Sequence, residues 1–459
     1  MRTTPVILAA GQGTRMKSAL PKQMHPILGK PLTWYGVQAA RQATETQPVV
    51  VVGHGAEQMR QYFAGEVQFV EQEQQLGTGH AVLQAERALR GQTDLVLVTY
   101  ADMPLLRGDT LRALVKAQER HTGPMTMLTL VTDDPRGFGR IVRDAQGRVQ
   151  AIVEEKQATP EQLALRELNP GVYCFRSDWL WDALHRIPLS SKGEYYLTDT
   201  VALAVGDGLQ VETIQAEDVE EMIGINTRVH LAEAAAAMRA RINEQWMLEG
   251  VTIVDPATTY VEPEVVIGRD TVIWPNTYLH EKTVIGEACV IGPNTIIRSS
   301  RLGNRVQALA SVIESALLED DVNLGPYAHL RKGAHLAQGV HLGNFGEVKN
   351  SYLGPGVKMG HFAYLGDAQI GANVNIGAGT ITCNFGMDGK KRPTEIGEGA
   401  FIGSDTMLVA PVKVGAGAAT GSGAVVTKDV PPNSLAVGVP ARVIRKLKPE
   451  SGETSHSKG

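Results

Sequence analysis

A glycine-rich turn near the start of the chain carries residues suited to phosphate chemistry. The apolar run Val6–Ala9 predicts a strand, and Gly11, Gly13, Arg15 and Lys22 follow it. Such a turn lets backbone N–H groups approach phosphate oxygens closely, and the two cations can offset the charge that develops during phosphoryl transfer. The turn matches neither a Walker A loop nor the full dinucleotide-binding fingerprint. A plain tight turn would use the same glycines.

A lone carboxylate follows a second apolar strand. The run Leu95–Thr99 predicts this strand, and Asp102 comes just after it. Mg²⁺ is typically held by one or two carboxylates together with substrate phosphates, and Asp102 suits that role. Asp102 could instead cap the helix that begins after Pro104. A second glycine-rich turn, within Gln74–His80, opens another helix.

Cations in the second half of the chain are informative where their spacing matches a six-residue repeat. Arg331 and Lys349 are 18 residues apart, or three six-residue repeats. Two cations stacked in this way could seat a phosphate, although ordinary surface residues could share the spacing. His361 follows Gly360 and precedes Tyr364. A histidine has a pKa near neutral and can act as a general base, although a lone histidine is more often structural.

Alternating strands and helices are predicted for residues 1–226. The strands are Val6–Ala9, Val49–Val52, Val67–Val70, Leu95–Thr99, Met125–Leu130 and Gly171–Phe175. The helices are Leu32–Arg41, Ala56–Phe63, His80–Leu89 and Thr110–Arg120. This alternation favours a Rossmann-like α/β domain with a mainly parallel sheet. Ligands of such domains bind outside the carboxyl ends of the strands.

Two further segments are distinguished by composition. Residues 227–248 are rich in Ala, Glu, Arg and Met and lack Gly and Pro, so they predict one long helix that joins two domains. Residues 449–459 are mainly Ser, Glu, Lys and Gly, and we expect a disordered tail.

Residues 249–448 carry a six-residue repeat. Aliphatic residues recur at this interval in three runs: Val261 to Ile297, Val312 to Val348, and Ile396 to Val414. This period is typical of a parallel β-helix, in which three faces close a coil of about 18 residues, and it predicts about ten coils. The interval from Ile376 to Ile396 is too long for one coil, so a polar excursion is expected to leave the helix there.

Composition limits the class of protein. The chain has 459 residues, 43% of them hydrophobic, and a net charge of −5, which gives no sign of nucleic-acid binding. No apolar run approaches the ~18 residues of a membrane span. The three cysteines, Cys174, Cys289 and Cys383, are scattered without metal-site spacing. Free thiols and the lack of a signal peptide predict a cytoplasmic protein.

The motifs together resemble a known enzyme family. Residues 1–226 resemble the sugar-1-phosphate nucleotidyltransferases, and Gly360–Asp367 matches an acetyltransferase motif. Nearly the whole chain resembles the bifunctional N-acetylglucosamine-1-phosphate uridylyltransferase/glucosamine-1-phosphate N-acetyltransferase family, which has a left-handed β-helix. The resemblance implies acetylation of glucosamine 1-phosphate by acetyl-CoA. UMP is then transferred from UTP to the product, and pyrophosphate is released. It also implies Mg²⁺ and a homotrimer.

The resemblance also assigns residues. In the first domain it implies that the nucleotide is contacted by Leu8, Ala9, Gly11 and Gly13, its phosphates by the catalytic residues Arg15 and Lys22, and its uracil by Gln72, Gly77 and Thr78. It implies that Tyr100 lines the site and that Asp102 and Asn226 bind Mg²⁺. It also implies sugar contacts by Gly139, Glu154 and Asn169. The segment Gly193–Asp199 resembles the family's substrate-side segment. In the β-helix it implies a general base at His361, amino-sugar phosphate contacts by Arg331, Lys349, Tyr364 and Asn375, and contacts near acetyl-CoA by Asn384, Phe385, Ser404, Ser422 and Arg442.

The chain departs from the family pattern in two places. Where the family has an aromatic residue directly followed by Asp-Gly, this chain reads Phe385-Gly-Met-Asp-Gly. Gly438 takes a position that often carries a CoA-contacting arginine, which Arg442 or Arg445 could replace.

Three alternatives remain open from the sequence. The β-helix could be a trimerisation scaffold below a nucleotidyltransferase with a single activity, or the nucleotide could be dTTP, ATP or GTP. A zinc site at His329, His335 and His341 is disfavoured, because a spacing of six puts them on three different faces.

Overall fold

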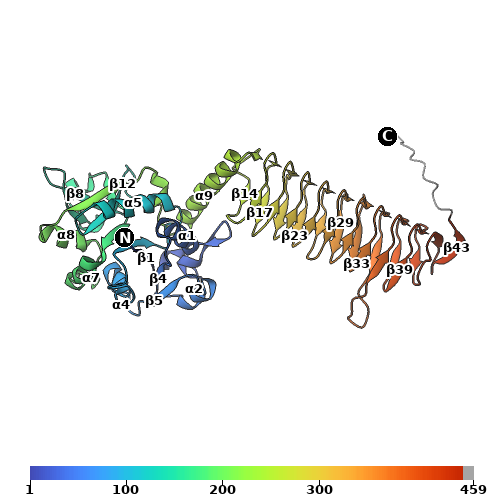
Figure 1. Ribbon diagram of the computed structural model, residues 1–459, viewed down its shortest axis with the longest axis horizontal. Helices are drawn as coiled ribbons and strands as arrows, with labels where there is room; N and C mark the ends of the chain where they lie inside the picture. Colours follow the sequence, from blue (N-terminus) through green and yellow to red (C-terminus); the bar gives the residue numbers. More distant parts are fainter. Residues whose placement is uncertain (448–459) are drawn as a thin grey trace. The chain divides into compact units, whose positions relative to one another are not determined.

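The computed structural model describes residues 1–447 (Figure 1). Two compact units divide the chain, Met1–Met238 and the residues from Arg239 onward. The predicted tail at residues 449–459 lies outside the described residues.

Four parallel strands form one side of the ten-stranded sheet in the first unit. Their order is β5 (Gln68–Glu71), β4 (Val49–Val52), β1 (Thr3–Ala9) and β6 (Leu95–Tyr100). All three pairings among these strands are parallel. Every residue of β1 and β4 is buried, as expected for strands with both faces covered. The predicted α/β domain is confirmed, and the carboxyl ends of β1 and β6 lie next to each other.

The other side of the sheet contains an antiparallel region that was not predicted from the sequence. β11 (Tyr173–Arg176) is antiparallel to both β6 and β7 (Met125–Val131), and β12 (Val211–Gln215) pairs in parallel with β7. Beyond β7 the sheet continues through β10 (Glu167–Asn169), β8 (Gly139–Arg143) and β9 (Val149–Val153), all antiparallel. A separate two-stranded sheet is formed by β2 (Pro26–Ile27) and β3 (Lys30–Pro31). The antiparallel region supplies residues of the sugar side described below.

Helices connect these strands. The α-helices are α1 (Leu32–Thr44), α2 (Ala56–Tyr62), α3 (Thr78–Leu83), α4 (Glu86–Leu89), α5 (Gly108–Arg120), α6 (Pro160–Leu163), α7 (Ser177–Arg186) and α8 (Asp199–Gly206). The 3-10 helices are η1 (Thr14–Met16), η2 (Lys22–Met24), η3 (Glu155–Gln157) and η4 (Val219–Met222). The helix predicted for His80–Leu89 is in fact two short helices, α3 and α4, which are separated at Gln84 and Ala85.

The predicted joining helix is present as α9 (Arg228–Leu248). The division between the two compact units falls inside it, between Met238 and Arg239. In its second half, Ile242 and Trp246 pack against the core of the β-helix. The buried Asn243 amide donates hydrogen bonds to the carbonyl oxygens of Pro256 (2.9 Å) and Thr259 (3.0 Å). These contacts attach this half of α9 to the first coil.

Three sheets of parallel strands form the walls of the β-helix, apart from the antiparallel last strand β43. Wall one contains β13 (Thr252–Ile253), β16 (Val272–Ile273), β19 (Val290–Ile291), β22 (Gln307–Ala308), β25 (Asn323–Leu324), β28 (His341–Leu342), β31 (Lys358–Met359), β34 (Asn375–Ile376), β37 (Phe401–Ile402), β40 (Ala419–Thr420), β42 (Ser434–Val437) and β43 (Arg442–Lys446). Wall two contains β14 (Tyr260–Val261), β17 (Tyr278–His280), β20 (Ile296–Arg298), β23 (Val312–Glu314), β26 (His329–Leu330), β29 (Gly346–Lys349), β32 (Ala363–Gly366), β35 (Ile381–Cys383), β38 (Met407–Val409) and β41 (Val425–Val426). Wall three contains β15 (Val266–Ile267), β18 (Val284–Ile285), β21 (Arg301–Leu302), β24 (Leu317–Leu318), β27 (His335–Leu336), β30 (Tyr352–Leu353), β33 (Ala368–Ile370), β36 (Thr394–Ile396) and β39 (Val412–Val414).

The aliphatic repeat builds the core of these walls. Residues such as Ile273, Ile291, Leu324 and Leu342 have almost no exposed surface and stack along the inside of wall one. The strands are shorter than the predicted six residues, because much of each repeat forms the corner between walls. Stacked neighbours supply the apolar contacts that a single coil cannot make alone.

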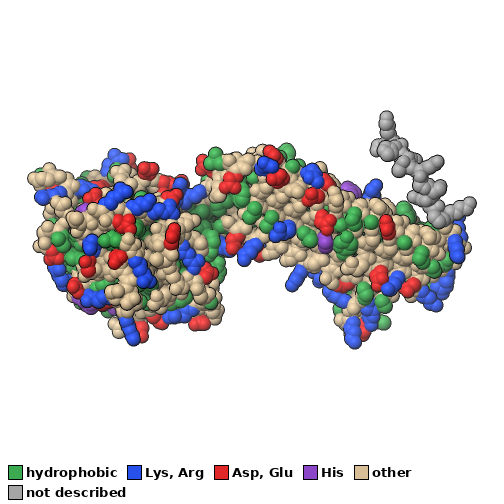
Figure 2. Space-filling model, in the orientation of Figure 1, with side chains coloured by type: hydrophobic (Ala, Val, Ile, Leu, Met, Phe, Trp, Pro, Cys, Tyr) green, Lys and Arg blue, Asp and Glu red, His purple; other side chains and the backbone are tan. Residues whose placement is uncertain are grey.

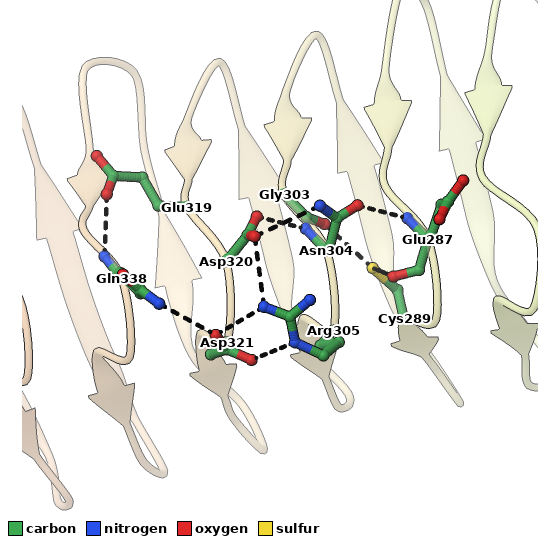
Figure 3. A network of polar contacts seen from close by, with 9 residues as sticks. All are labelled: Glu287, Cys289, Gly303, Asn304, Arg305, Glu319, Asp320, Asp321 and Gln338. Atoms are coloured by element: carbon green, nitrogen blue, oxygen red, sulfur yellow. Dashed lines mark hydrogen bonds and ion pairs between the residues drawn. The ribbon is translucent and has the colours of Figure 1, made fainter.

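A polar network crosses the corners that follow wall three (Figure 3). Asn304 N–H donates to Asp320 Oδ1 (2.8 Å), 16 residues further along the chain. Arg305 donates to both carboxylate oxygens of Asp321, at 2.6 and 2.9 Å. In this region the paired residues of successive coils are 16 or 17 positions apart, so the second aliphatic run is out of step with the first. The polar side chains of the network connect the corners of these shorter coils.

Candidate active sites

Two adjoining cavities lie at the carboxyl ends of β1 and β6. One has a volume of 300 Å³ and the other 320 Å³, and both are lined by Thr78, Tyr100, Asp102 and Tyr196. Predicted residues that line the first cavity are Leu8, Gly11, Lys22, Gln72, Gly77, Thr78, Tyr100 and Asp102. Those that line the second also include Gly139, Glu154, Asn169 and Asn226. Most of the predicted residues of this domain are therefore brought together, whereas Ala9 is buried within β1.

The glycine-rich turn is closed against the segment that carries Lys22. The Gln23 amide donates a hydrogen bond to the carbonyl oxygen of Gly11 (2.8 Å). Gly13 has a positive φ of 63°, and a Cβ atom there would lie 2.5 Å from the Lys22 Cβ. Glycine is therefore required at position 13 for both its torsion and the close approach, and that approach places Lys22 beside the turn.

Two cationic side chains meet two side chains that carry acceptor oxygens beside the cavities. The Arg15 guanidinium donates to Asn226 Oδ1 (2.8 Å), and the Lys22 ammonium forms an ion pair with Asp102 and lies 3.4 Å from the same Asn226 oxygen. The Ile225 N–H donates to the Asp102 carbonyl oxygen (2.9 Å), which fixes the returning segment beside β6.

A hard divalent cation fits this donor set. Asp102 offers carboxylate oxygens and Asn226 an amide oxygen, which are the ligand types that Mg²⁺ prefers. Among residues 1–447, no group of three or more His, Cys, Asp or Glu side chains forms a complete metal cage. A cation held by Asp102 and Asn226 would therefore need oxygens of the substrate and of water to complete its coordination.

Gln72 and the turn at Gly77 form one end of the first cavity. The buried Gln72 amide donates to the Gly77 carbonyl oxygen (3.1 Å). Gly77 has a φ of 99°, and a Cβ atom there would lie 2.6 Å from the Tyr195 carbonyl oxygen. The Leu197 N–H donates to Thr78 Oγ1 (3.0 Å), so the predicted substrate-side segment folds against this turn.

Glu154 and Asn169 lie on the other side, in the second cavity. The Asn169 amide donates to the Tyr173 hydroxyl (2.8 Å), and the Thr198 hydroxyl donates to Glu154 Oε1 (3.3 Å). Burial raises the pKa of the Glu154 carboxyl, and the neighbouring Asp199 raises it further. Burial raises the pKa of Tyr100 strongly, with a further contribution from Asp102, so its phenol stays neutral and can donate a hydrogen bond.

Several lining residues were not assigned individually from the sequence. Tyr196 and Thr198 belong to the predicted substrate-side segment, but no single residue of that segment had been given a role. Gln75 and Phe138 also line the cavities. The second glycine-rich turn was the signal for Gln75, whereas Phe138 had none.

Cations gather on wall two of the β-helix. Val348 accepts a hydrogen bond from the Arg331 N–H (2.9 Å), which confirms that Arg331 and Lys349 occupy neighbouring coils. Arg331 Nη1 also pairs with Glu347 (2.8 Å). The pKa of the Lys349 ammonium is lowered by Arg331 and then by Lys391. Lys391 therefore lies near Lys349, although the sequence predicted only that it belongs to the excursion.

The predicted excursion is a β-hairpin between β35 and β36, with Lys and Arg side chains gathered on it (Figure 2). Phe385 bridges to Lys391, and the Gly386 N–H donates to the Lys390 carbonyl oxygen (2.8 Å). Arg392 pairs with Asp388 at 2.7 Å across the hairpin end. The inserted Phe385-Gly-Met-Asp-Gly stretch thus forms the end of the hairpin that carries Lys391.

Asn384 and Tyr364 approach each other above Gly366. The buried Asn384 amide donates to Asp367 Oδ2 (2.5 Å). A Cβ atom added to Gly366 would lie 2.7 Å from Asn384 Nδ2, and closer still to the Tyr364 hydroxyl. The Tyr364 hydroxyl and the Asn384 amide can therefore occupy these positions only because Gly366 has no side chain.

The edge where wall one passes into wall two, termed the one–two edge, collects most of the other predicted residues. His361 is exposed on it between β31 and β32, and Asn375 lies on β34, one coil further on. Ser404 and Ser422 follow on this edge, and the Gly423 N–H donates to the Ser404 carbonyl oxygen (2.8 Å). Arg442 lies instead on β43 and donates to its neighbour's carbonyl oxygen.

Two other predictions concern positions outside this group. His329, His335 and His341 lie on walls two, three and one respectively, as the spacing predicted. Within residues 1–447, no helix is long and apolar enough to cross a membrane.

Comparisons with known proteins cover both units. A family model described as a MobA-like NTP transferase domain matches residues 5–194, and one for the bacterial transferase hexapeptide (six repeats) matches residues 264–299 and 393–428. The "Bifunctional protein GlmU" of Heliobacterium modesticaldum is 47% identical over 438 residues, which cover 95% of each chain. The proteins of that name from Pelobacter propionicus and Geobacter metallireducens are 46% and 48% identical, over 96% and 94% of this chain and 96% and 95% of theirs. The chain therefore belongs to the GlmU family of bifunctional uridylyltransferase and acetyltransferase enzymes.

Proposed function

We propose that the β-helix acetylates glucosamine 1-phosphate from acetyl-CoA and that the α/β unit then joins the product to UTP. The products are UDP-N-acetylglucosamine and pyrophosphate. One observation supports this most directly: each unit contains its own cluster of cations beside its own set of uncharged hydrogen-bonding groups. A chain with one activity would need only one such cluster.

At the first site we assign the nucleotide to the cavity of Gln72 and Gly77 and the sugar to that of Glu154 and Asn169. An oxygen of the sugar phosphate attacks the α-phosphorus of UTP, and the bond to the pyrophosphate leaving group breaks. Arg15 and Lys22 offset the charge that develops on the phosphate oxygens. Asp102 and Asn226 would hold Mg²⁺, which would supply further positive charge to the same oxygens.

At the second site we assign the sugar phosphate to Arg331, Lys349 and Lys391. The amine attacks the thioester carbon of acetyl-CoA, His361 takes the amine's proton, and the C–S bond breaks to release CoA. Tyr364 and Asn375 would hold the sugar, while Ser404 and Ser422 would line the path of CoA along the one–two edge. We assign Asn384 to the sugar as well, although the resemblance places it near acetyl-CoA, because its amide lies beside the Tyr364 hydroxyl above Gly366. Phe385 and Arg442 stay predicted CoA contacts.

We also propose that β-helices associate as a homotrimer through the one–two edge. Tyr327, Phe345 and Phe362 are each more than half exposed on this edge, one coil apart, and the first two rings stack with centroids 5.4 Å apart. Exposed aromatic rows are typical of contact surfaces. Because His361 adjoins Phe362, such a contact would place the acetyl-transfer site between subunits. The cytoplasmic location stays a prediction.

Activity with separated substrates tests the proposal. Thiol release from acetyl-CoA should require glucosamine 1-phosphate, and UDP-sugar formation should require UTP, a divalent cation and the acetylated sugar phosphate. Parallel assays with dTTP, ATP and GTP test the nucleotide. The β-helix would be a scaffold only if no thiol were released while UDP-sugar formation remained.

A further inference from the structure

The loop that carries Arg15 and Lys22 is connected to the first residue of α9. The Arg228 Nε–H donates to the Met16 carbonyl oxygen (3.4 Å), and its Nη1–H donates to His25 Nδ1 (3.1 Å). His25 is 2% exposed. Arg228 thus bridges two points of the loop, one directly after Arg15 and one three residues after Lys22.

The chemistry of this contact fixes the state of His25. A guanidinium can only donate hydrogen bonds, so His25 Nδ1 must accept, and the ring must be neutral with its proton on Nε2. Burial, and then the charge of Arg228, lowers the pKa of His25. Among the described residues, His25 Nε2 makes no hydrogen bond that meets the geometric limits, although the nearby backbone of Leu20 partly offsets the lowering of the His25 pKa. A buried polar group without a full partner is destabilising, and an apolar residue here would avoid that cost.

The same loop is also held at Gln23, between Met16 and His25. Besides the Gln23–Gly11 hydrogen bond, the Thr33 hydroxyl donates to the Gln23 carbonyl oxygen (3.1 Å). Contacts to Gly11 and Thr33 hold the loop at Gln23, while the contacts of Arg228 hold it at Met16 and His25. Arg15 directly precedes Met16 and Lys22 directly precedes Gln23, and both cations reach Asn226, two residues before Arg228 in the chain.

We propose that His25 and Arg228 are positioning residues for uridylyl transfer. Neutral His25 accepts from Arg228, and the pair holds the loop so that Arg15 and Lys22 face the phosphates. Neither side chain needs to touch substrate for this role. The inference rests on the proposed uridylyl transfer of the same site.

Three variants of the full chain separate positioning from packing. His25→Leu fills the buried position with an apolar side chain and removes the acceptor, and Arg228→Met removes the donor. We expect each to lower kcat for uridylyl transfer roughly 10–100-fold, because displacement of catalytic groups by about 1 Å can cost 10²-fold, while the KM for the sugar phosphate changes little. His25→Asn offers an oxygen close to the position of Nδ1 and should recover most of the rate. His230→Leu, on the same helix, is the matched control and should behave as wild type.

The double variant and the second activity complete the test. If the two side chains act as one pair, His25→Leu with Arg228→Met should be no slower than the worse single variant. Acetyl transfer and the melting temperature should be unchanged in all of them. The inference is overturned if wild type forms UDP-sugar and His25→Leu does so equally well, if His25→Asn is as slow as His25→Leu, or if both activities fall together with the melting temperature. An inactive wild type overturns the proposed uridylyl transfer, and the inference with it.

Discussion

Replacement of Gly366 by alanine should disable acetyl transfer without damaging the β-helix. Its φ lies outside the range that favours glycine, so the backbone accepts alanine, but the new methyl group would lie 2.7 Å from Asn384 Nδ2. An ordinary contact of 3.4 Å requires that amide to move by about 0.7 Å, and the Tyr364 hydroxyl must move further. Displacements near 1 Å can cost about 10²-fold in rate, which corresponds to about 2.7 kcal/mol.

Thiol release from acetyl-CoA with saturating glucosamine 1-phosphate measures this effect. We expect a fall of about 10²-fold in Gly366→Ala, since two groups assigned to the sugar are displaced together. Uridylyl transfer should be unchanged. Gly206→Ala is the matched control, because a methyl group there meets nothing within 4 Å. Near-normal acetyl transfer would refute the assignment of Tyr364 and Asn384, and a large fall in melting temperature would show that Gly366 serves packing instead.

Three other variants test the remaining assignments. Asp102→Asn should abolish most uridylyl transfer and leave acetyl transfer intact, because a hard cation needs charged oxygen; normal Mg²⁺-dependent turnover would contradict the metal assignment. Lys391→Ala should raise the KM for glucosamine 1-phosphate and leave CoA binding unchanged, because one of the three cations assigned to the sugar phosphate is lost. If the wild type uses glucosamine without a phosphate equally well, the assignment of these cations to the phosphate is wrong. His361→Ala should slow acetyl transfer about 10²–10⁴-fold, while added N-acetylglucosamine 1-phosphate still gives UDP-sugar; a loss below tenfold would argue against a general base.

The β-helix was predictable because its repeat is local and periodic. Aliphatic residues six apart identify the inward positions, and the spacing between Arg331 and Lys349 then places them on neighbouring coils. The strand β1 and the turn at Gly11 were equally predictable, because a short, fully apolar run followed by glycines rarely forms anything other than a buried strand and a turn. Each of these predictions needed only residues close together in the sequence.

Other features depend on contacts that no local pattern records. The antiparallel strands β8 and β10 contain charged residues that pair across the sheet, such as Arg143 with Glu167 (2.6 Å), so their sequences do not look like buried strands. The closeness of Lys391 to Lys349 depends on how the hairpin folds back. Arg228 contacts His25 across 203 positions of the chain, and nothing in either segment indicates the other.

The hairpin between β35 and β36 has a consequence for how this enzyme can change. On either side of it the walls keep their pairing: Ile370 still opposes Ile396, and Ile376 opposes Ile402. The free energy needed to close a loop grows slowly with length, by about 0.6 kcal/mol for each doubling. Residues can therefore be added to or removed from the hairpin end while the core stays in register. Mutation can therefore change the side chains of this hairpin, including the Gly-Met-Asp-Gly stretch after Phe385, at little risk to folding.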